Sequence, residues 1–97
     1  MTNKSEVLDQ LIKIIRTNKS KSPELSYTSA LFKKGKIKIA NKVGEESTET
    51  ITAFLSQGKN EIAEESADLI FHLFVLLEYS SVSPDDVFDV LFGRRNN

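Results

Sequence analysis

The chain has 97 residues, with 13 basic and 14 acidic side chains, a formal net charge of −1 and no cysteine. This length suits one compact domain, and the lack of cysteine excludes disulfide bonds and thiolate metal sites. The balanced charge argues against a nucleic-acid-binding protein. Neither a signal peptide nor a run of ~20 apolar residues is present. These features predict one domain over residues 1–97 of a soluble, cytoplasmic protein that binds neither nucleic acid nor membrane.

Helical periodicity runs through the whole chain, and nothing alternates as a strand would. Five helical segments are expected in turn, over residues 5–19, 27–34, about 37–56, about 61–79 and from 84 onward. Gly35 and Gly58 mark two of the breaks, and Asn60 suits the cap of the fourth helix. Ser83 suits the N-cap of the last helix, with Pro84 at its first position. The sequence therefore predicts an all-α antiparallel bundle of four main helices and a short one.

The two long helices differ in their apolar patterns. The first is expected to bury a stripe formed by Ile39, Ala40, Val43, Ile51 and Phe54. The second is apolar almost all round after Asp68, which is typical of a buried central helix. Its expected core or interface residues are Leu69, Ile70, Leu73, Leu76 and Leu77. Because this is more apolar surface than a small bundle easily covers, we also expect a homodimer.

Carboxylates are paired on each long helix. Glu46 and Glu49 are spaced i, i+3 and so are neighbours on a helix surface, and Glu65 and Asp68 repeat that spacing on the next helix. The short connection near Gly58 makes the two helices antiparallel neighbours. Four facing carboxylates would repel one another strongly. A divalent cation would relieve this repulsion, and oxygen ligands favour Mg2+, with Mn2+ as a possible substitute.

Each carboxylate motif by itself is more often a solvated helix face. The combination is what favours a metal site, since both pairs have the same spacing and one lies in the most apolar segment of the chain. His72 continues the polar strip of the second helix. We interpret it as a hydrogen-bonded histidine of the core or its rim rather than as a metal ligand.

A basic segment, FKKGKIKIANK, precedes the first acidic pair. Lys36 and Lys38 are interpreted as solvated, whereas Lys42 lies one turn before Glu45 and Glu46 on the same side of the helix. Lysine beside a carboxylate-bound cation suggests a ligand with several phosphates. At the end of the chain, Arg94 and Arg95 either add phosphate contacts or form a frayed basic terminus.

These motifs resemble a known pattern. EESTE, a gap of 15 residues and ESAD are similar to the EExxE…ExxD signature of the all-alpha nucleotide pyrophosphohydrolases, which include the MazG proteins. SYTSALFKKG, KVGEESTE, ESADLIFHLFVLL and SPDDVFDVL together resemble, in order and spacing, the phosphoribosyl-ATP pyrophosphohydrolases of histidine biosynthesis. The resemblance covers roughly residues 6–95.

The resemblance implies a reaction, in which phosphoribosyl-ATP and water give phosphoribosyl-AMP and pyrophosphate. It also implies a stand-alone homodimeric enzyme that uses magnesium. Glu46, Glu49, Glu65 and Asp68 would be the metal ligands, and Glu45 would orient or deprotonate the attacking water. The candidate residues for binding substrate and phosphate are Ser26, Tyr27, Thr28, Lys34, Lys42, His72, Arg94 and Arg95.

Two alternatives stay open at this point. One is a MazG-like hydrolase of other nucleoside triphosphates, which would share the carboxylates and differ in SYT and in the C-terminal segment. The other is a non-catalytic helical scaffold whose acids form a solvated face. A scaffold would show neither turnover nor an effect of magnesium on stability.

Overall fold

The computed structural model describes residues 4–95, which form five α-helices and contain no strand. A short 3-10 helix, Lys4–Glu6, leads into the first of them. The helices are α1 (Val7–Asn18), α2 (Tyr27–Lys34), α3 (Lys36–Ser56), α4 (Lys59–Tyr79) and α5 (Pro84–Arg94). The predicted all-α class and all five helical segments are thus confirmed. No helix in the described range has the length and apolarity that a membrane crossing requires.

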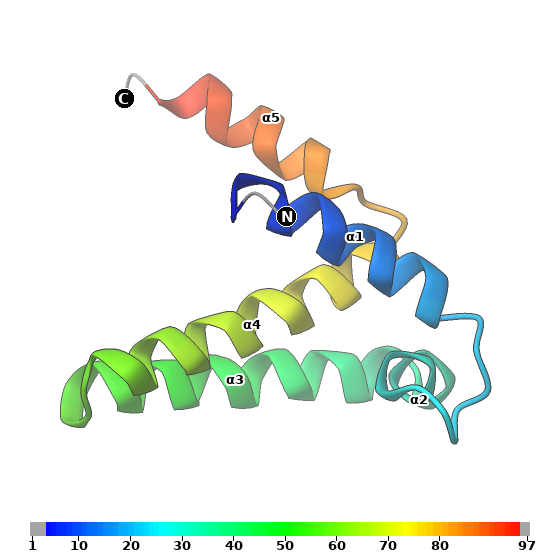
Figure 1. Cartoon of the computed structure of the whole chain (residues 1–97), viewed down its shortest axis with the longest axis horizontal. Helices are drawn as coiled ribbons and strands as arrows, with labels where there is room; N and C mark the ends of the chain where they lie inside the picture. Colours follow the sequence, from blue (N-terminus) through cyan, green and yellow to red (C-terminus); the bar gives the residue numbers. More distant parts are fainter. Residues whose placement is uncertain (1–3, 96–97) are drawn as a thin grey trace.

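The antiparallel pair α3–α4 is the centre of the molecule. The two helices lie side by side near their connection and diverge toward their other ends (Figure 1). The side chains of α3 that become buried are Ile39, Glu46 and Ala53, each seven residues after the last. A spacing of seven keeps residues on one face of a helix. Glu46 therefore lies on the buried face of α3, together with Ile39 and Ala53.

The expected apolar stripe of α3 was partly wrong. Ile39 is buried, but Ile51 and Phe54 are 57% and 72% exposed, and Ala40 is exposed as well. On α4, Leu77 is buried while Ile70 and Leu73 remain 41% and 37% exposed. The spacing of apolar residues shows which of them share one face of a helix. It does not show which face packs against the neighbouring helix of the same chain.

The start of α2 and its junction with α3 follow from local chemistry. Ser26 is the N-cap of α2, and its hydroxyl accepts a hydrogen bond from the Ser29 backbone N–H at 3.1 Å. Gly35 alone separates α2 from α3, with φ +94° and ψ −170°. Only glycine adopts this region without strain. The sharp turn at Gly35 sets α2 across the end of the α3–α4 pair (Figure 1).

Helix α1 packs against the C-terminal half of α4. Ile15 of α1 is 1% exposed and joins Phe74, Val75 and Leu77 in the core. Glu78 accepts hydrogen bonds from two basic side chains of this region, Arg16 at 3.2 Å and Lys19 at 2.5 Å.

Helix α5 begins as predicted, because Ser83 accepts from the Asp85 backbone N–H and Asp86 accepts from the Ser83 backbone N–H. The cap expected at Asn60 was wrong. Helix α4 starts at Lys59, and Gly58 is its N-cap, with the Gly58 N–H donating to Glu61 at 3.1 Å.

Candidate active site

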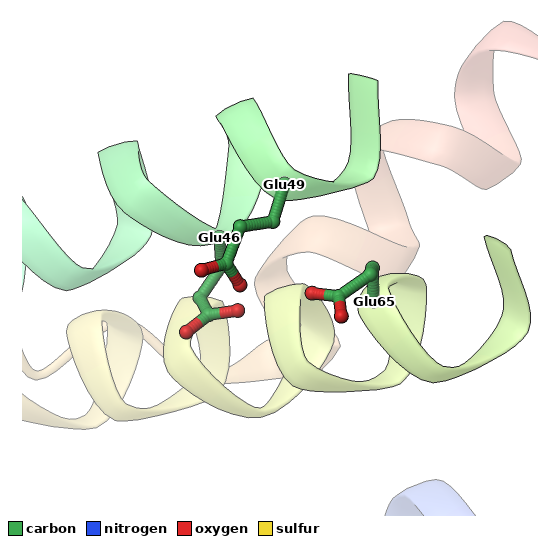
Figure 2. A group of neighbouring side chains, drawn as sticks. All are labelled: Glu46, Glu49 and Glu65. Carbon is green, nitrogen blue, oxygen red and sulfur yellow. The ribbon is translucent and has the colours of Figure 1, made fainter. Parts of the chain in front are cut away.

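Three carboxylates meet between α3 and α4. Glu46 and Glu49 come from α3 and Glu65 from α4, and one oxygen of each lies within 4.8 Å of the others. Figure 2 shows their side chains pointing toward one another across the space between the helices. The i, i+3 spacing brings the first two together, and the antiparallel packing brings the third. A surface pocket of ≈ 140 Å³ adjoins Glu49 and Glu65.

The three carboxylates are crowded and incompletely satisfied. Glu46 Oε2 and Glu65 Oε2 are buried and have no hydrogen-bond partner in the described part of the chain. Burial raises the pKa of Glu46, and the Glu49 carboxylate raises it further. A hydrogen bond with Glu49 is the main cause of the raised pKa of Glu65, followed by burial. Unpaired buried carboxylate oxygens are costly, so this arrangement fits a bound cation.

Asp68 lies next to this cluster but is not part of it. Its side chain is exposed, and its negative charge contributes to the raised pKa of both Glu46 and Glu65. Asp68 lies one turn along α4 from Glu65. It is therefore near the cluster, but its carboxylate is not among the three whose oxygens lie within 4.8 Å of one another. The donor set of three to four carboxylates consists of oxygen only, which suits hard divalent cations.

Lys42 joins the basic and the acidic parts of α3. Its Nζ lies 3.0 Å from Glu45 Oε2 and 3.7 Å from Glu46 Oε1. The hydrogen bond from Lys42 keeps the pKa of Glu45 below its usual range, and the same bond raises the pKa of Lys42. Glu45 is therefore ionised at neutral pH. It stands at the exposed rim of the site, where a carboxylate can accept a hydrogen bond from water.

The SYT segment lies against the same region. Ser26 caps α2, Thr28 is 3% exposed, and Tyr27 reaches across to α4. The Tyr27 hydroxyl oxygen is 2.7 Å from His72 Nε2, and His72 Nδ1 is 2.7 Å from the Asp68 carbonyl oxygen. His72 is 7% exposed. Both of its ring nitrogens thus have a partner within the protein, and the predicted contact of His72 with substrate stays a prediction.

The remaining predicted residues are not brought to the carboxylates within this chain. Lys34 is exposed in the last turn of α2. Arg94 ends α5, and the guanidinium of Arg95 packs over the Phe92 ring of its own helix at 3.6 Å. That end of α5 lies well apart from the α3–α4 pair (Figure 1). Their proposed contacts with phosphate stay predictions.

Sequence reasoning missed Thr50. Its hydroxyl is 2.8 Å from the Glu46 carbonyl oxygen and 3.2 Å from the Glu65 carbonyl oxygen of the facing helix. The second contact ties α3 to α4 at the level of the carboxylates. Its position in the sequence could have indicated this role, because Thr50 follows Glu46 by four residues and so lies on the same face of the helix.

Comparison with known proteins agrees with these observations. The family model for phosphoribosyl-ATP pyrophosphohydrolase matches residues 8–95. A phosphoribosyl-ATP pyrophosphatase of Sulfurisphaera tokodaii is 52% identical over 90 residues, covering 93% of this chain and 96% of that protein. A protein of the same name from Saccharolobus islandicus is 46% identical over 91 residues, covering 94% and 97% of the two chains. The chain belongs to the phosphoribosyl-ATP pyrophosphohydrolase family.

Proposed function

We propose that this chain hydrolyses the α–β phosphoanhydride bond of phosphoribosyl-ATP, giving phosphoribosyl-AMP and pyrophosphate, in the second step of histidine biosynthesis. Membership of the family supports the substrate. The observation that carries the chemistry is the meeting of three carboxylates, two with buried and unpaired oxygens, between α3 and α4. Since cysteine is absent, a reducing cytoplasm suits the chain, and we place the reaction there.

Glu46, Glu49 and Glu65 would hold a divalent cation, with Asp68 as a fourth candidate ligand. Magnesium fits carboxylate oxygens, and manganese is a possible substitute. When bound, such an ion would lower the pKa of a water molecule and offset the charge of the phosphates.

The chain's own residues supply the other parts of the mechanism. Glu45 is held ionised by Lys42 at 3.0 Å, so it can accept a hydrogen bond from the attacking water and orient it. The ammonium of Lys42 lies 3.7 Å from Glu46 Oε1, where it would bind the phosphate oxygens and offset the charge of the departing pyrophosphate. Hydrolysis of a phosphoanhydride depends mainly on such positioning and charge, and no covalent intermediate is needed.

We also infer that the enzyme works as a homodimer. Large apolar side chains remain exposed at the tip of the α3–α4 pair, which is the end where the two helices are connected near Gly58, and on α5. They are Ile51, Phe54, Leu55, Val90, Leu91 and Phe92. Exposed apolar surface on this scale is typical of an interface. A second copy of the chain is the partner that the resemblance implies.

The decisive experiment is a substrate panel with detection of pyrophosphate. Phosphoribosyl-ATP, ATP, dATP and dUTP would be incubated with the purified chain, each with and without magnesium. We expect magnesium-dependent release of pyrophosphate from phosphoribosyl-ATP well above that from the other three. Preference for an ordinary triphosphate would assign the MazG-like activity instead. Release from none of them under any condition would refute the proposed function.

A further inference from the structure

The hydroxyl of Thr50 lies between the backbones of two carboxylate residues, one on each long helix. Its oxygen is 2.8 Å from the Glu46 carbonyl oxygen in α3 and 3.2 Å from the Glu65 carbonyl oxygen in α4. The same two residues carry the buried side-chain oxygens that lack a hydrogen-bond partner in the described part of the chain. One side chain therefore contacts the main chain of both residues whose buried carboxylates a cation would satisfy.

Both contacts are compatible with a single hydroxyl group. A hydroxyl carries one proton, which can be shared between two acceptors in a three-centre hydrogen bond. Each carbonyl oxygen has two lone pairs, so it can accept from Thr50 as well as from an N–H group of its own helix. The bond to the carbonyl four residues earlier restricts the rotamer of a helical threonine, and so it fixes the direction in which the Thr50 hydroxyl points.

A small side chain lets the two helices approach closely at this level. Ala53 follows Thr50 by three residues, which places it on the same side of α3, and it is 0% exposed. The distance between packed helices depends on the side chains at their contact. With only a methyl group at Ala53, the backbones lie close enough for a hydroxyl of α3 to reach a carbonyl oxygen of α4.

Other hydroxyl groups of α3 show what distinguishes Thr50. Those of Ser47, Thr48 and Ser56 bond to the carbonyl oxygen four residues earlier in their own helix, at 2.8, 3.1 and 2.9 Å. Among the described hydrogen bonds of α3, the hydroxyl of Thr50 is the one that also reaches α4. The contact with Glu65 is therefore specific to Thr50 rather than a general property of hydroxyl side chains in this helix.

We propose that Thr50 is a positioning residue, which fixes the register of α3 against α4 so that the three carboxylates of the cluster converge on one divalent cation. Apolar burial has no preferred direction, whereas a hydrogen bond has a narrow range of distance and angle. The contact therefore restricts sliding of the two helices in a way that apolar packing does not. The proposal rests on the proposed function for the cation, and it gives Thr50 no contact with the cation or the substrate.

The contact itself can be tested without metal or substrate. In isotopically labelled protein with a chelator present, the carbonyl carbon chemical shift of Glu65 reports the hydrogen bonds that its oxygen accepts. Thr50→Val keeps the shape of the side chain and removes the hydroxyl, so it should shift this signal, and Thr50→Ser should keep it near its wild-type position. Thr48→Val is the matched control, since the Thr48 hydroxyl bonds to Gly44 of its own helix, and it should leave the Glu65 signal in place. A Glu65 signal that is the same in Thr50→Val and in the wild type would overturn the proposal.

Metal affinity is the second test. Binding of Mn2+ can be followed by electron paramagnetic resonance of the free ion, which needs neither substrate nor turnover. Thr50→Val should weaken Mn2+ binding roughly tenfold, the lower end of the loss that is typical when a group orienting metal ligands is removed. Thr50→Ser should restore most of the affinity, and Thr48→Val should bind like the wild type. Equal affinity of Thr50→Val and the wild type, or no rescue by serine, would overturn the proposal.

Kinetics separate positioning from a loss of stability. In Thr50→Val, the magnesium concentration for half-maximal activity should rise by a factor similar to that for Mn2+ binding. Most of the wild-type kcat should return at saturating magnesium, because the substitution reduces occupancy of the site. Val75→Ala is the control for destabilisation, since Val75 is 0% exposed on α4 and distant from Glu65 along the helix. It should lower Tm and leave the magnesium requirement unchanged. A lower kcat at saturating magnesium, with an unchanged magnesium requirement in Thr50→Val, would contradict the positioning role.

The outcomes distinguish this proposal from the proposed function. A wild type that binds Mn2+ but does not hydrolyse phosphoribosyl-ATP would refute the proposed function, and the Mn2+ affinities of the variants would still decide the role of Thr50. An active wild type together with a Thr50→Val variant of unchanged Mn2+ affinity would refute only the role of Thr50. A wild type that binds no divalent cation would refute both.

Discussion

The two ends of the α3–α4 pair differ in how completely the chain covers them. At one end, α2 crosses the pair, Tyr27 is hydrogen-bonded to His72 of α4, and Lys42 lies 3.7 Å from the buried Glu46. At the tip, where α3 and α4 are connected near Gly58, Phe54 and Leu55 are 72% and 73% exposed. Among the described helices, only α3 and α4 reach this end (Figure 1). This difference is what the proposed function leads us to expect, with polar side chains for the chemistry at the covered end and apolar surface for the proposed dimer at the tip.

The largest expected effect lies in the carboxylate cluster. Glu65→Gln should lower kcat/KM by roughly 100-fold or more, as expected for the loss of one preorganised electrostatic contact, while the helix content by circular dichroism stays unchanged. Glu64→Gln is the matched control, since it makes the same change one residue earlier at an exposed position outside the cluster. Near-normal activity of the Glu65 variant would remove this residue from the site.

The next effect concerns the tip. Phe54→Asp places a charge on the exposed apolar surface, so it should convert the expected dimer to a monomer at micromolar concentration, as measured by light scattering after size exclusion. Leu25→Asp is the control, because Leu25 is 81% exposed in the connection between α1 and α2. It should leave the mass unchanged. A wild-type chain that is monomeric at high concentration would contradict the dimer.

The covered end depends on the turn at Gly35. Gly35→Ala puts a side chain where φ is +94°, so it should lower the free energy of unfolding by about 1–3 kcal/mol. Gly44 lies inside α3, and a Cβ added there meets nothing within 4 Å. Gly44→Ala should therefore stabilise the chain, by about 0.5–1 kcal/mol. Chemical denaturation at one fixed protein concentration gives both changes in unfolding free energy. If Gly35→Ala were the more stable of the two variants, alanine would not strain this turn.

The crowded carboxylates predict a pH dependence in the absence of metal. The folded-state pKa of Glu46 is raised above its ordinary value, so its ionised form destabilises the folded chain. This penalty is absent below the ordinary carboxyl pKa, grows as the pH rises toward the raised value, and is complete above it.

Glu46→Gln removes that penalty. At neutral pH and with a chelator present, it should raise Tm by roughly 4 °C, and the gain should vanish in acid, where Glu46 is protonated in both states. Added magnesium should stabilise the wild type and have much less effect on the variant. If the chelated wild type were the more stable protein at neutral pH, the carboxylates could not be repelling one another as described.

The sequence predicted most of the fold because helices are specified locally. The spacing of apolar residues placed all five helices, and Ser83 and Gly35 marked boundaries through their own backbone preferences. The i, i+3 pairs likewise brought Glu46 and Glu49 together. Which face of α3 meets α4 is a non-local property, so Phe54 was assigned to the core although it is exposed.

Contacts between distant segments were the other limit on prediction. His72 was correctly expected to be hydrogen-bonded in the core or at its rim, yet its partners, Tyr27 and the Asp68 carbonyl, depend on how α2 crosses α4. The crossing angle between α2 and α4 cannot be predicted from the spacing of residues in one sequence. The participation of Asp68, Lys34, Arg94 and Arg95 in the site stays a prediction.

The smallest expected effect concerns Thr50, which joins the two helices beside the cluster. Its hydroxyl is shared between the carbonyl oxygens of Glu46 and Glu65, and Thr50→Val removes it while keeping the shape of the side chain. Unfolding free energy should fall by about 0.5–1.5 kcal/mol. Thr48→Val is the control, because the Thr48 hydroxyl bonds only to the Gly44 carbonyl of its own helix and is exposed, so the change should stay within about 0.5 kcal/mol. Equal losses for the two variants would show that the contact across the helices adds nothing, and the register of the carboxylates would then depend on apolar packing alone.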